Sequence, residues 1–158
     1  MTTTTTKPST NGLAGFKTLK YAYRESFVSI GNESEQEIGS SDIVFASGRD
    51  WADFYFTPGT LFVDEKEKKT DAGKTLDNSI KFSFPGDSSA MTYLLNTMCN
   101  KYFVLLIEDM NGNNLLFGNT DTPLKMRYEK KKESKPSGAK HYEIEFYGTT
   151  LNTAIYVV

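Results

Sequence analysis

The chain has 158 residues, of which 38% are hydrophobic, 24% are charged and 13% are aromatic, and its formal net charge is −2. One ordinary domain has this length and buries about 70% of the surface that its unfolded chain exposes, which is enough for a core. The near-neutral charge gives no overall field that would attract a nucleic acid or an anionic membrane. A single cysteine excludes an internal disulfide and a cysteine-based zinc site.

The N-terminal residues differ in composition from the rest of the chain. Residues 1–12 are polar and include five consecutive threonines, so we expect them to form a flexible arm. We expect residues 13–158 to form a single β-rich domain. The sequence does not open on the apolar run of a signal peptide, and no stretch approaches the roughly 20 apolar residues of a membrane span. We therefore expect synthesis in the cytoplasm and no membrane partner.

The first half of the domain carries strand patterns separated by polar segments. Residues 16–30 are rich in Phe, Tyr and Val and predict one or two strands, and residues 31–42 predict a polar loop. In residues 52–56, Ala52, Phe54 and Phe56 alternate with the more polar Asp53 and Tyr55. This pattern predicts a half-buried strand that ends at the following Pro-Gly pair. Mixed charges come next, and they favour a long exposed loop at about residues 58–75, or a protruding hairpin.

One strand and one helix are clearly marked in the middle of the chain. Residues 76–84 alternate with period two, so that five side chains share a face: Leu76, Asn78, Ile80, Phe82 and Phe84. A helix is predicted at about residues 88–99, because Asp87 and Ser88 are both good N-caps. Its apolar stripe follows the spacing i, i+3, i+4, i+7 and consists of Met91, Leu94, Leu95 and Met98.

The most apolar stretch, residues 101–118, is divided by an asparagine-rich tip. Its first part predicts a strand buried on both faces, and its second part predicts a strand that returns beside the first. Asp109, Asn111 and Asn113 alternate as the oxygen ligands of a calcium loop do, but an EF-hand requires a glycine directly after the third ligand and helices on both sides. Asn-Gly is a favoured pair in hairpin turns, so the sequence predicts a turn here and no metal site.

Two further strands are predicted near the C-terminus. Residues 124–128 and residues 142–146 both alternate between apolar and charged side chains. If they form a hairpin, one register gives two opposite-charge pairs: Lys125 with Glu145, and Arg127 with Glu143. A long flexible loop is predicted at about residues 130–140, and residues 154–158 predict a last strand. The predicted fold is therefore mainly β, an antiparallel β-sandwich or barrel with one packed α-helix.

The sequence offers no convincing arrangement for catalysis. The single histidine, His141, begins an amphipathic strand, and the single cysteine, Cys99, closes the helix, where a small buried role is typical. Asp50 and Asp53 stand at a strand entrance, which is typical of solvated carboxylates. Neither a nucleophile elbow nor a zinc-protease motif is present. We expect a protein that is not an enzyme, with no catalytic residues, no cofactor and no metal.

Two segments are candidates for contact with other molecules. Leu61, Phe62 and Val63 stand between a turn and a charged segment, so they either end a core strand or form an exposed patch that needs a partner; they are the candidate subunit interface. The second segment is the basic cluster, which consists of Lys130, Lys131, Lys132 and Lys135. It can contact a phosphate backbone or an acidic patch on a neighbouring subunit, although a solvated loop is the commoner role of such a run.

Four stretches follow one another in a recognisable order: FTPGT, IKFSFPG, NKYFVLLIEDMNGNNLLFGNTDTPLKMRYE and HYEIEFYGTT. In this order the chain resembles small virion proteins of tailed bacteriophages and of prophages of gut bacteria, over roughly residues 12–150. The resemblance implies a tail-tube-like fold and a structural role as a ring or tube subunit in the tail or the head–tail connector. The implied partners are copies of the chain, neighbouring virion proteins and, non-specifically, passing genomic DNA. The implied location is the virion, assembled in the host bacterial cytoplasm.

Two other roles are open at the level of sequence. A carbohydrate-binding β-sandwich module would require an exposed aromatic platform, for which Trp51, Tyr55 and Tyr147 are the available residues. A capsid-decoration or packaged cargo protein would share the fold of a ring subunit, and the sequence does not separate the two.

Overall fold

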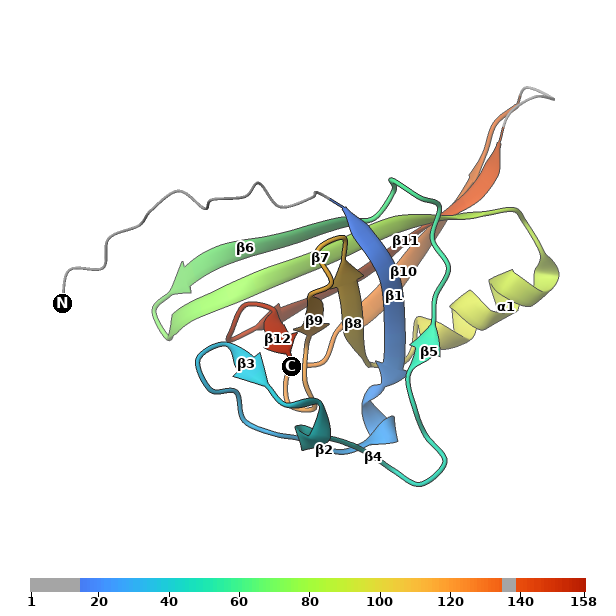
Figure 1. The fold of residues 1–158 in the computed structure, drawn as a ribbon. Helices are drawn as coiled ribbons and strands as arrows, with labels where there is room; N and C mark the ends of the chain where they lie inside the picture. The colour runs from blue at the N-terminus through green and yellow to red at the C-terminus, as the bar shows by residue number, and fades with distance from the viewer. Residues whose placement is uncertain (1–14, 135–138) are drawn as a thin grey trace.

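The computed structural model describes residues 15–134 and 139–158, so the expected arm at residues 1–12 lies outside the described residues. Two sheets pack face to face, and one α-helix lies at one end of them (Figure 1). This arrangement confirms the predicted mainly β fold with a single packed α-helix. Within the described ranges, no helix has the length and apolar character needed to cross a membrane.

Six short strands form the lower sheet in Figure 1. Their order is β3-β12-β9-β8-β1-β5, and all described neighbours are antiparallel except β12 and β3. The bounds are β1 Phe16–Tyr23, β3 Glu37–Ile38, β5 Ala52–Asp53, β8 Phe103–Asp109, β9 Asn114–Phe117 and β12 Ile155–Val157. The central strand β8 is largely buried on both faces, as its unbroken apolar run predicts.

Four long strands form the upper sheet, in the order β10-β11-β7-β6, with every neighbouring pair antiparallel. The bounds are β6 Phe62–Thr70, β7 Gly73–Pro85, β10 Lys125–Lys132 and β11 Lys140–Thr150. The β6–β7 hairpin projects beyond the body at one end of this sheet, and the β10–β11 hairpin projects at the other end (Figure 1). The sheet is therefore longer than the body that it covers.

The two sheets enclose one large apolar core. Alternate side chains of β7 and β11 point into it, among them Ile80, Phe82, Tyr142, Ile144 and Phe146, which are all at most 2% exposed. The helix α1, Ser89–Met98, adds Leu95 and Met98 to this core. The Ser88 hydroxyl accepts a hydrogen bond from the backbone N–H of Met91 at 3.1 Å, which confirms the predicted N-cap.

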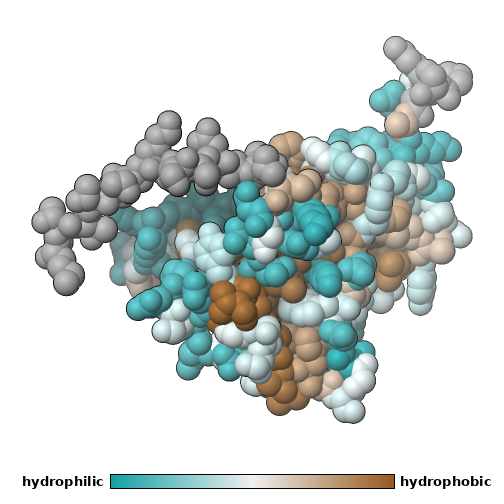
Figure 2. All heavy atoms as spheres, viewed as in Figure 1, coloured by the Kyte–Doolittle hydropathy of each residue, from teal (hydrophilic) through white to brown (hydrophobic). Residues whose placement is uncertain are grey.

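A smaller two-stranded ribbon covers the other face of the six-stranded sheet. It consists of β2, Phe27–Ile30, and β4, Ile43–Phe45, and it packs the rings of Phe27, Phe45 and Trp51 against one another. Hydrophobic residues gather in the lower part of the view in Figure 2, where this ribbon lies, on a face that is otherwise mostly hydrophilic.

Of the two segments that the sequence marks as loops, the first is largely strand and the second is strand at its two ends. The segment at about 58–75 contains β6 and the start of β7, so the protruding hairpin is the correct alternative. The predicted loop at about 130–140 is also wrong in its bounds, because β10 continues to Lys132 and β11 begins at Lys140. Hairpin pairing in both segments outweighs the low strand propensity of their charged residues.

The strand predicted over residues 52–56 ends after Asp53. The reason is that the chain leaves one sheet for the other at this point. The backbone N–H of Phe54 still donates to the carbonyl of Leu19 in the six-stranded sheet, whereas that of Thr57 donates to the carbonyl of Ser83 in the four-stranded sheet. Phe54 is buried during the crossing, which explains its apolar side chain without a longer strand.

The register between β10 and β11 differs by two residues from the predicted one. Arg127 lies opposite Glu145 instead of Glu143, so both predicted charge pairs are wrong. Gly148 explains the shift, because a Cβ atom at this position would lie only 3.0 Å from Cδ2 of Leu124. Leu124 is fully buried, so a side chain at position 148 would force it to shift.

Candidate assembly surface

The four-stranded sheet ends on both sides in a strand whose outer edge is open. Among the described residues, β6 pairs only with β7, and β10 pairs only with β11. β6 has 9 residues and β10 has 8, so both edges are long. An open edge presents unpaired N–H and C=O groups and is a template for pairing with another chain.

The two open edges run in opposite directions. Three antiparallel pairings separate β10 from β6, and each pairing reverses the strand direction. A rotation that carries one copy of the sheet beside the next would therefore bring β6 antiparallel to β10 of the neighbouring copy. Cyclic assemblies use contacts of this head-to-tail kind.

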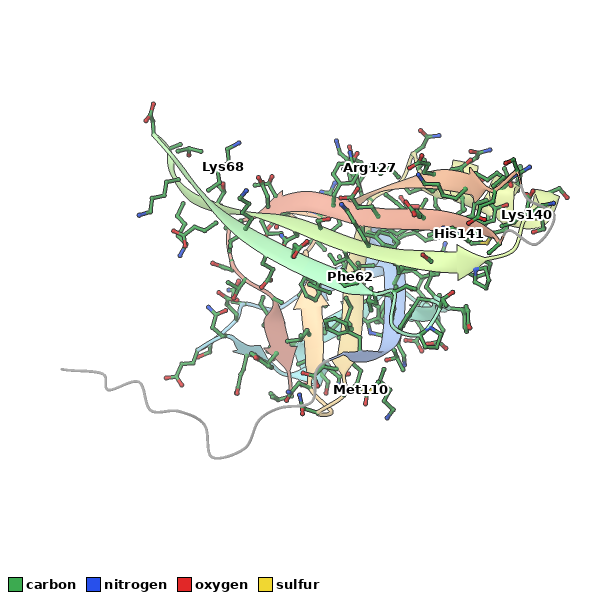
Figure 3. The ribbon with its side chains drawn as sticks, turned by 90° about the horizontal axis from the view of Figure 1, so that it is seen from above. Phe62, Lys68, Met110, Arg127, Lys140 and His141 are labelled. Atoms are coloured by element: carbon green, nitrogen blue, oxygen red, sulfur yellow. The ribbon has the colours of Figure 1, made fainter. Side chains whose placement is uncertain are left out.

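A groove of about 630 Å³ crosses the outer face of the four-stranded sheet, which is the face turned away from the six-stranded sheet. One wall is a row of four side chains, one from each strand in register: Phe62, Lys81, Glu145 and Arg127. The opposite wall includes Ser83, Glu143 and Glu129. Figure 3 shows Phe62 and Arg127 on this face, with Lys68 toward one end of the sheet and Lys140 at the other.

The three candidate interface residues separate in the structure. Leu61 is 7% exposed and belongs to the core, and Val63 packs against the same core. Phe62 lies between them on the outer face and is 64% exposed. Of the predicted patch, Phe62 is thus the member that is available to a partner.

An ion pair joins two neighbouring side chains of this wall, Arg127 and Glu145. Nε of Arg127 lies 2.6 Å from Oε2 of Glu145, and the Ser79 hydroxyl donates to Oε1 of Glu145 at 2.7 Å. The guanidinium also lies over the Tyr147 ring, 4.6 Å from its centroid. Partial burial opposes ionisation of Glu145, but the hydrogen bonds from Arg127 and Ser79 outweigh it and lower the pKa of this carboxyl.

The described residues of the basic cluster are all paired with carboxylates. Nζ of Lys130 lies 2.5 Å from Oδ1 of Asp87, and Nζ of Lys132 lies 2.9 Å from Oδ2 of the same residue. Nζ of Lys131 lies 3.0 Å from Oε1 of Glu129. Lys135 lies outside the described residues. The three described lysines thus share two carboxylates, which compensate most of their positive charge in the isolated subunit.

Asp87 is the residue that sequence reasoning missed, because the sequence indicates only an N-cap there. Hydrogen bonds from Lys130 and Lys132 lower its pKa from 3.8 to about 2, and the same contact raises the pKa of Lys130. The side chain of Asp87 is 18% exposed. The two lysines lie far from Asp87 in the sequence, so no local pattern could have indicated this contact.

The structure places the two residues considered for nucleophilic chemistry on different elements. His141 is the second residue of β11, and its Nε2 lies 3.6 Å from Oε1 of Glu143. Cys99 is the C-cap of α1, and burial raises the pKa of its thiol. In residues 15–134 and 139–158, no group of three or more His, Cys, Asp or Glu residues is placed to hold a metal ion.

The asparagine-rich tip forms the predicted turn between β8 and β9. Oδ1 of Asp109 accepts hydrogen bonds from the backbone N–H groups of Asn111 at 2.8 Å and of Asn113 at 3.0 Å, and Oδ2 accepts one from the Asn113 amide at 3.0 Å. Gly112 has a φ of +83°, which glycine adopts without strain. The carboxylate of Asp109 is thus used within the turn.

The three aromatic residues considered for carbohydrate binding do not form one platform. Trp51 is half-buried against the two-stranded ribbon, and Tyr147 is half-buried beneath Arg127 on the outer face of the four-stranded sheet. Tyr55 is 58% exposed and contacts Phe84.

Comparison of this chain with protein-family models, with curated proteins and with solved structures gives no match. Its function must therefore be argued from the geometry of its own surface.

Proposed function

We propose that this protein is a structural subunit of a tailed-bacteriophage virion, and that copies of it assemble into a ring or tube in the tail or the head–tail connector. The observation that carries the proposal is the pair of long, open, oppositely directed edges on the four-stranded sheet. The resemblance of the sequence to small virion proteins supports the same role. The subunits assemble in the host bacterial cytoplasm, and the role requires no catalytic step.

In the proposed ring, β6 of one subunit pairs with β10 of the next. The sheet of each subunit then continues into that of its neighbour, and every junction is antiparallel, like the pairings within the subunit. Backbone hydrogen bonds supply most of such a contact, and side chains on the paired edges select the register.

One register matches all 8 residues of β10 to β6 with the outer faces aligned. It places Asp64 opposite Lys131 of the neighbouring copy and Lys66 opposite Glu129, and these two opposite-charge pairs outnumber the one like-charge pair, Lys68 with Arg127. Opposite-charge cross-strand pairs contribute about 0.2–1 kcal/mol each. A shift by two residues in one direction would instead place Asp64 opposite Glu129, which is a repulsive pair.

Disulfide trapping tests the ring and its register separately. We expect the double variant Asp64→Cys/Lys131→Cys, in a Cys99→Ala background, to form a ladder of covalent oligomers under mild oxidation, because opposite residues of an antiparallel pair have the short Cα separation that a disulfide requires. The matched control is Asp64→Cys/Glu129→Cys, whose cysteines would lie on a diagonal, too far apart to cross-link efficiently.

Native mass spectrometry and electron microscopy of the same samples complete the test. A protein that stays monomeric at all concentrations would refute the ring. If the control variant forms cross-linked oligomers more efficiently than the test variant, the proposed register is refuted but the ring is not. Antibody labelling of purified phage particles distinguishes a position in the tail or connector from the capsid-decoration and cargo roles.

A further inference from the structure

Lys130 and Lys132 have the same orientation on β10. They are two residues apart on one strand, so both side chains lie on the face toward α1, about 7 Å apart along the strand. Each ammonium group contacts a different oxygen of the single Asp87 carboxylate, at 2.5 Å and 2.9 Å. Two lysines thus converge on one two-oxygen anion that belongs to the subunit itself.

The neighbouring groups hold this arrangement in place. The Tyr142 hydroxyl lies 3.4 Å from Oδ1 of Asp87, and Lys130 Nζ also lies 3.5 Å from the hydroxyl of Thr92 on α1. Lys130 lies over the Tyr142 ring, 5.7 Å from its centroid. The lysines therefore point at a fixed place, and Asp87 occupies it.

This pair of lysines lies where the β10–β11 hairpin leaves the body of the protein. β7 ends opposite His141, at Pro85, and beyond this point the described part of β10 and β11 continues as a two-stranded ribbon for one further pair, Lys132 with Lys140. Lys140 and Lys131 add two more cations to the ribbon. Figure 1 shows it standing clear of the rest of the molecule.

We propose that Lys130 and Lys132 form a binding site for the phosphate backbone of a nucleic acid, and that Asp87 masks this site in the free subunit. In a phosphodiester, as in a carboxylate, two oxygens share one negative charge. A phosphodiester can therefore replace Asp87 between the two ammonium groups. The contact carries no base-specific group and is therefore independent of sequence.

The masking explains why the free subunit is expected to bind nucleic acid weakly. With Asp87 in place the two lysines release few counterions when a phosphate approaches, and the net charge of the whole chain is −2. Unmasking adds two cations to the contact. DNA binding is measured on the unassembled subunit, so its outcome can be told apart from that of the ring test.

Salt-dependent binding to a double-stranded DNA of random sequence tests the site. We expect Asp87→Asn to bind this DNA more tightly than the wild type at low salt. Because each neutralised phosphate contributes about 0.9 to the slope of log K against log salt, freeing two lysines should steepen that slope by about 1.8. The triple variant Asp87→Asn/Lys130→Gln/Lys132→Gln should lose the gain.

Asp121→Asn is the charge-matched control, since Asp121 is exposed on a loop away from the lysines. Equal DNA binding by Asp87→Asn and Asp121→Asn would overturn the proposal, because net charge alone would then explain the gain. Equal or tighter binding of Asp87→Asn to polyglutamate would assign the lysines to an acidic protein partner instead, and would overturn the phosphate site. If Asp87→Asn does not fold, Asp87→Ser serves for the same comparison.

Discussion

Tyr142 connects α1 to the four-stranded sheet, and removal of its hydroxyl tests how much this connection stabilises the fold. The side chain is fully buried. Its oxygen lies 2.7 Å from the Thr92 hydroxyl, 3.1 Å from the Ser88 carbonyl and 3.3 Å from the Ser88 backbone nitrogen. Tyr142→Phe keeps the ring in the core and leaves the backbone N–H of Ser88 without its partner, whereas the Ser88 carbonyl keeps its hydrogen bonds from the hydroxyl and the backbone N–H of Thr92.

The expected cost follows from those contacts. A buried polar group that loses its partner costs about 1–3 kcal/mol, and in this variant that group is the backbone N–H of Ser88. The phenylalanine ring fills the same space, so no cavity term is added. For a domain of this size, each 1 kcal/mol lowers Tm by about 2–4 °C.

Urea unfolding followed by circular dichroism measures the difference, with both proteins at the same concentration because assembly would change the apparent stability. Tyr93→Phe is the control, since Tyr93 is 76% exposed on the same helix, and it should stay within about 0.5 kcal/mol of the wild type. If Tyr142→Phe is as stable as this control, the hydroxyl does not hold the helix and the reasoning is refuted.

Two further predictions concern the core and the Asp87 contact. Phe146→Ala should destabilise the fold by about 3–5 kcal/mol, whereas Phe62→Ala should have little effect on the monomer because Phe62 is 64% exposed; a cost for Phe62→Ala as large as that for Phe146→Ala would contradict the assignment of faces. The lowered pKa of Asp87 means that its contribution to stability is present above its ordinary pKa of 3.8 and is lost as the pH falls toward about 2. The wild type should therefore exceed Asp87→Asn in stability at neutral pH and lose this advantage on acidification, as pH-dependent thermal melts would show; a constant difference would refute the linkage.

The features that the sequence predicts correctly are those fixed by residues close together in the chain. The period-two pattern of residues 76–84 places Ile80 and Phe82 in the core, and the N-cap of α1 follows from Ser88. The turn after Asp109 needs only the Asn-Gly pair and one carboxylate that reaches the following N–H groups. The N-cap and the turn are determined locally because their hydrogen bonds join residues a few positions apart, and the buried face of the strand follows from alternation within the strand itself.

The register of the β10–β11 hairpin is not determined by residues close together in the chain. Charged residues recur at every second position, so the predicted register and the observed one both place Arg127 opposite a glutamate. The choice between them depends on the space beside Leu124. In the observed register this space is next to Gly148, which has no side chain to fill it. The packing around Leu124 therefore selects the strand register, which the alternation of charges does not determine.

The sequence by itself determined that this protein is mainly β, with one helix, and where most of the strands lie. The tertiary structure decided which strands became edges, which member of the predicted apolar patch faces outward, and that Asp87 forms ion pairs with both Lys130 and Lys132. The physical reason is that these properties depend on contacts between segments far apart in the chain. Such contacts exist only after the sheets have packed, and no pattern over a few neighbouring residues predicts them.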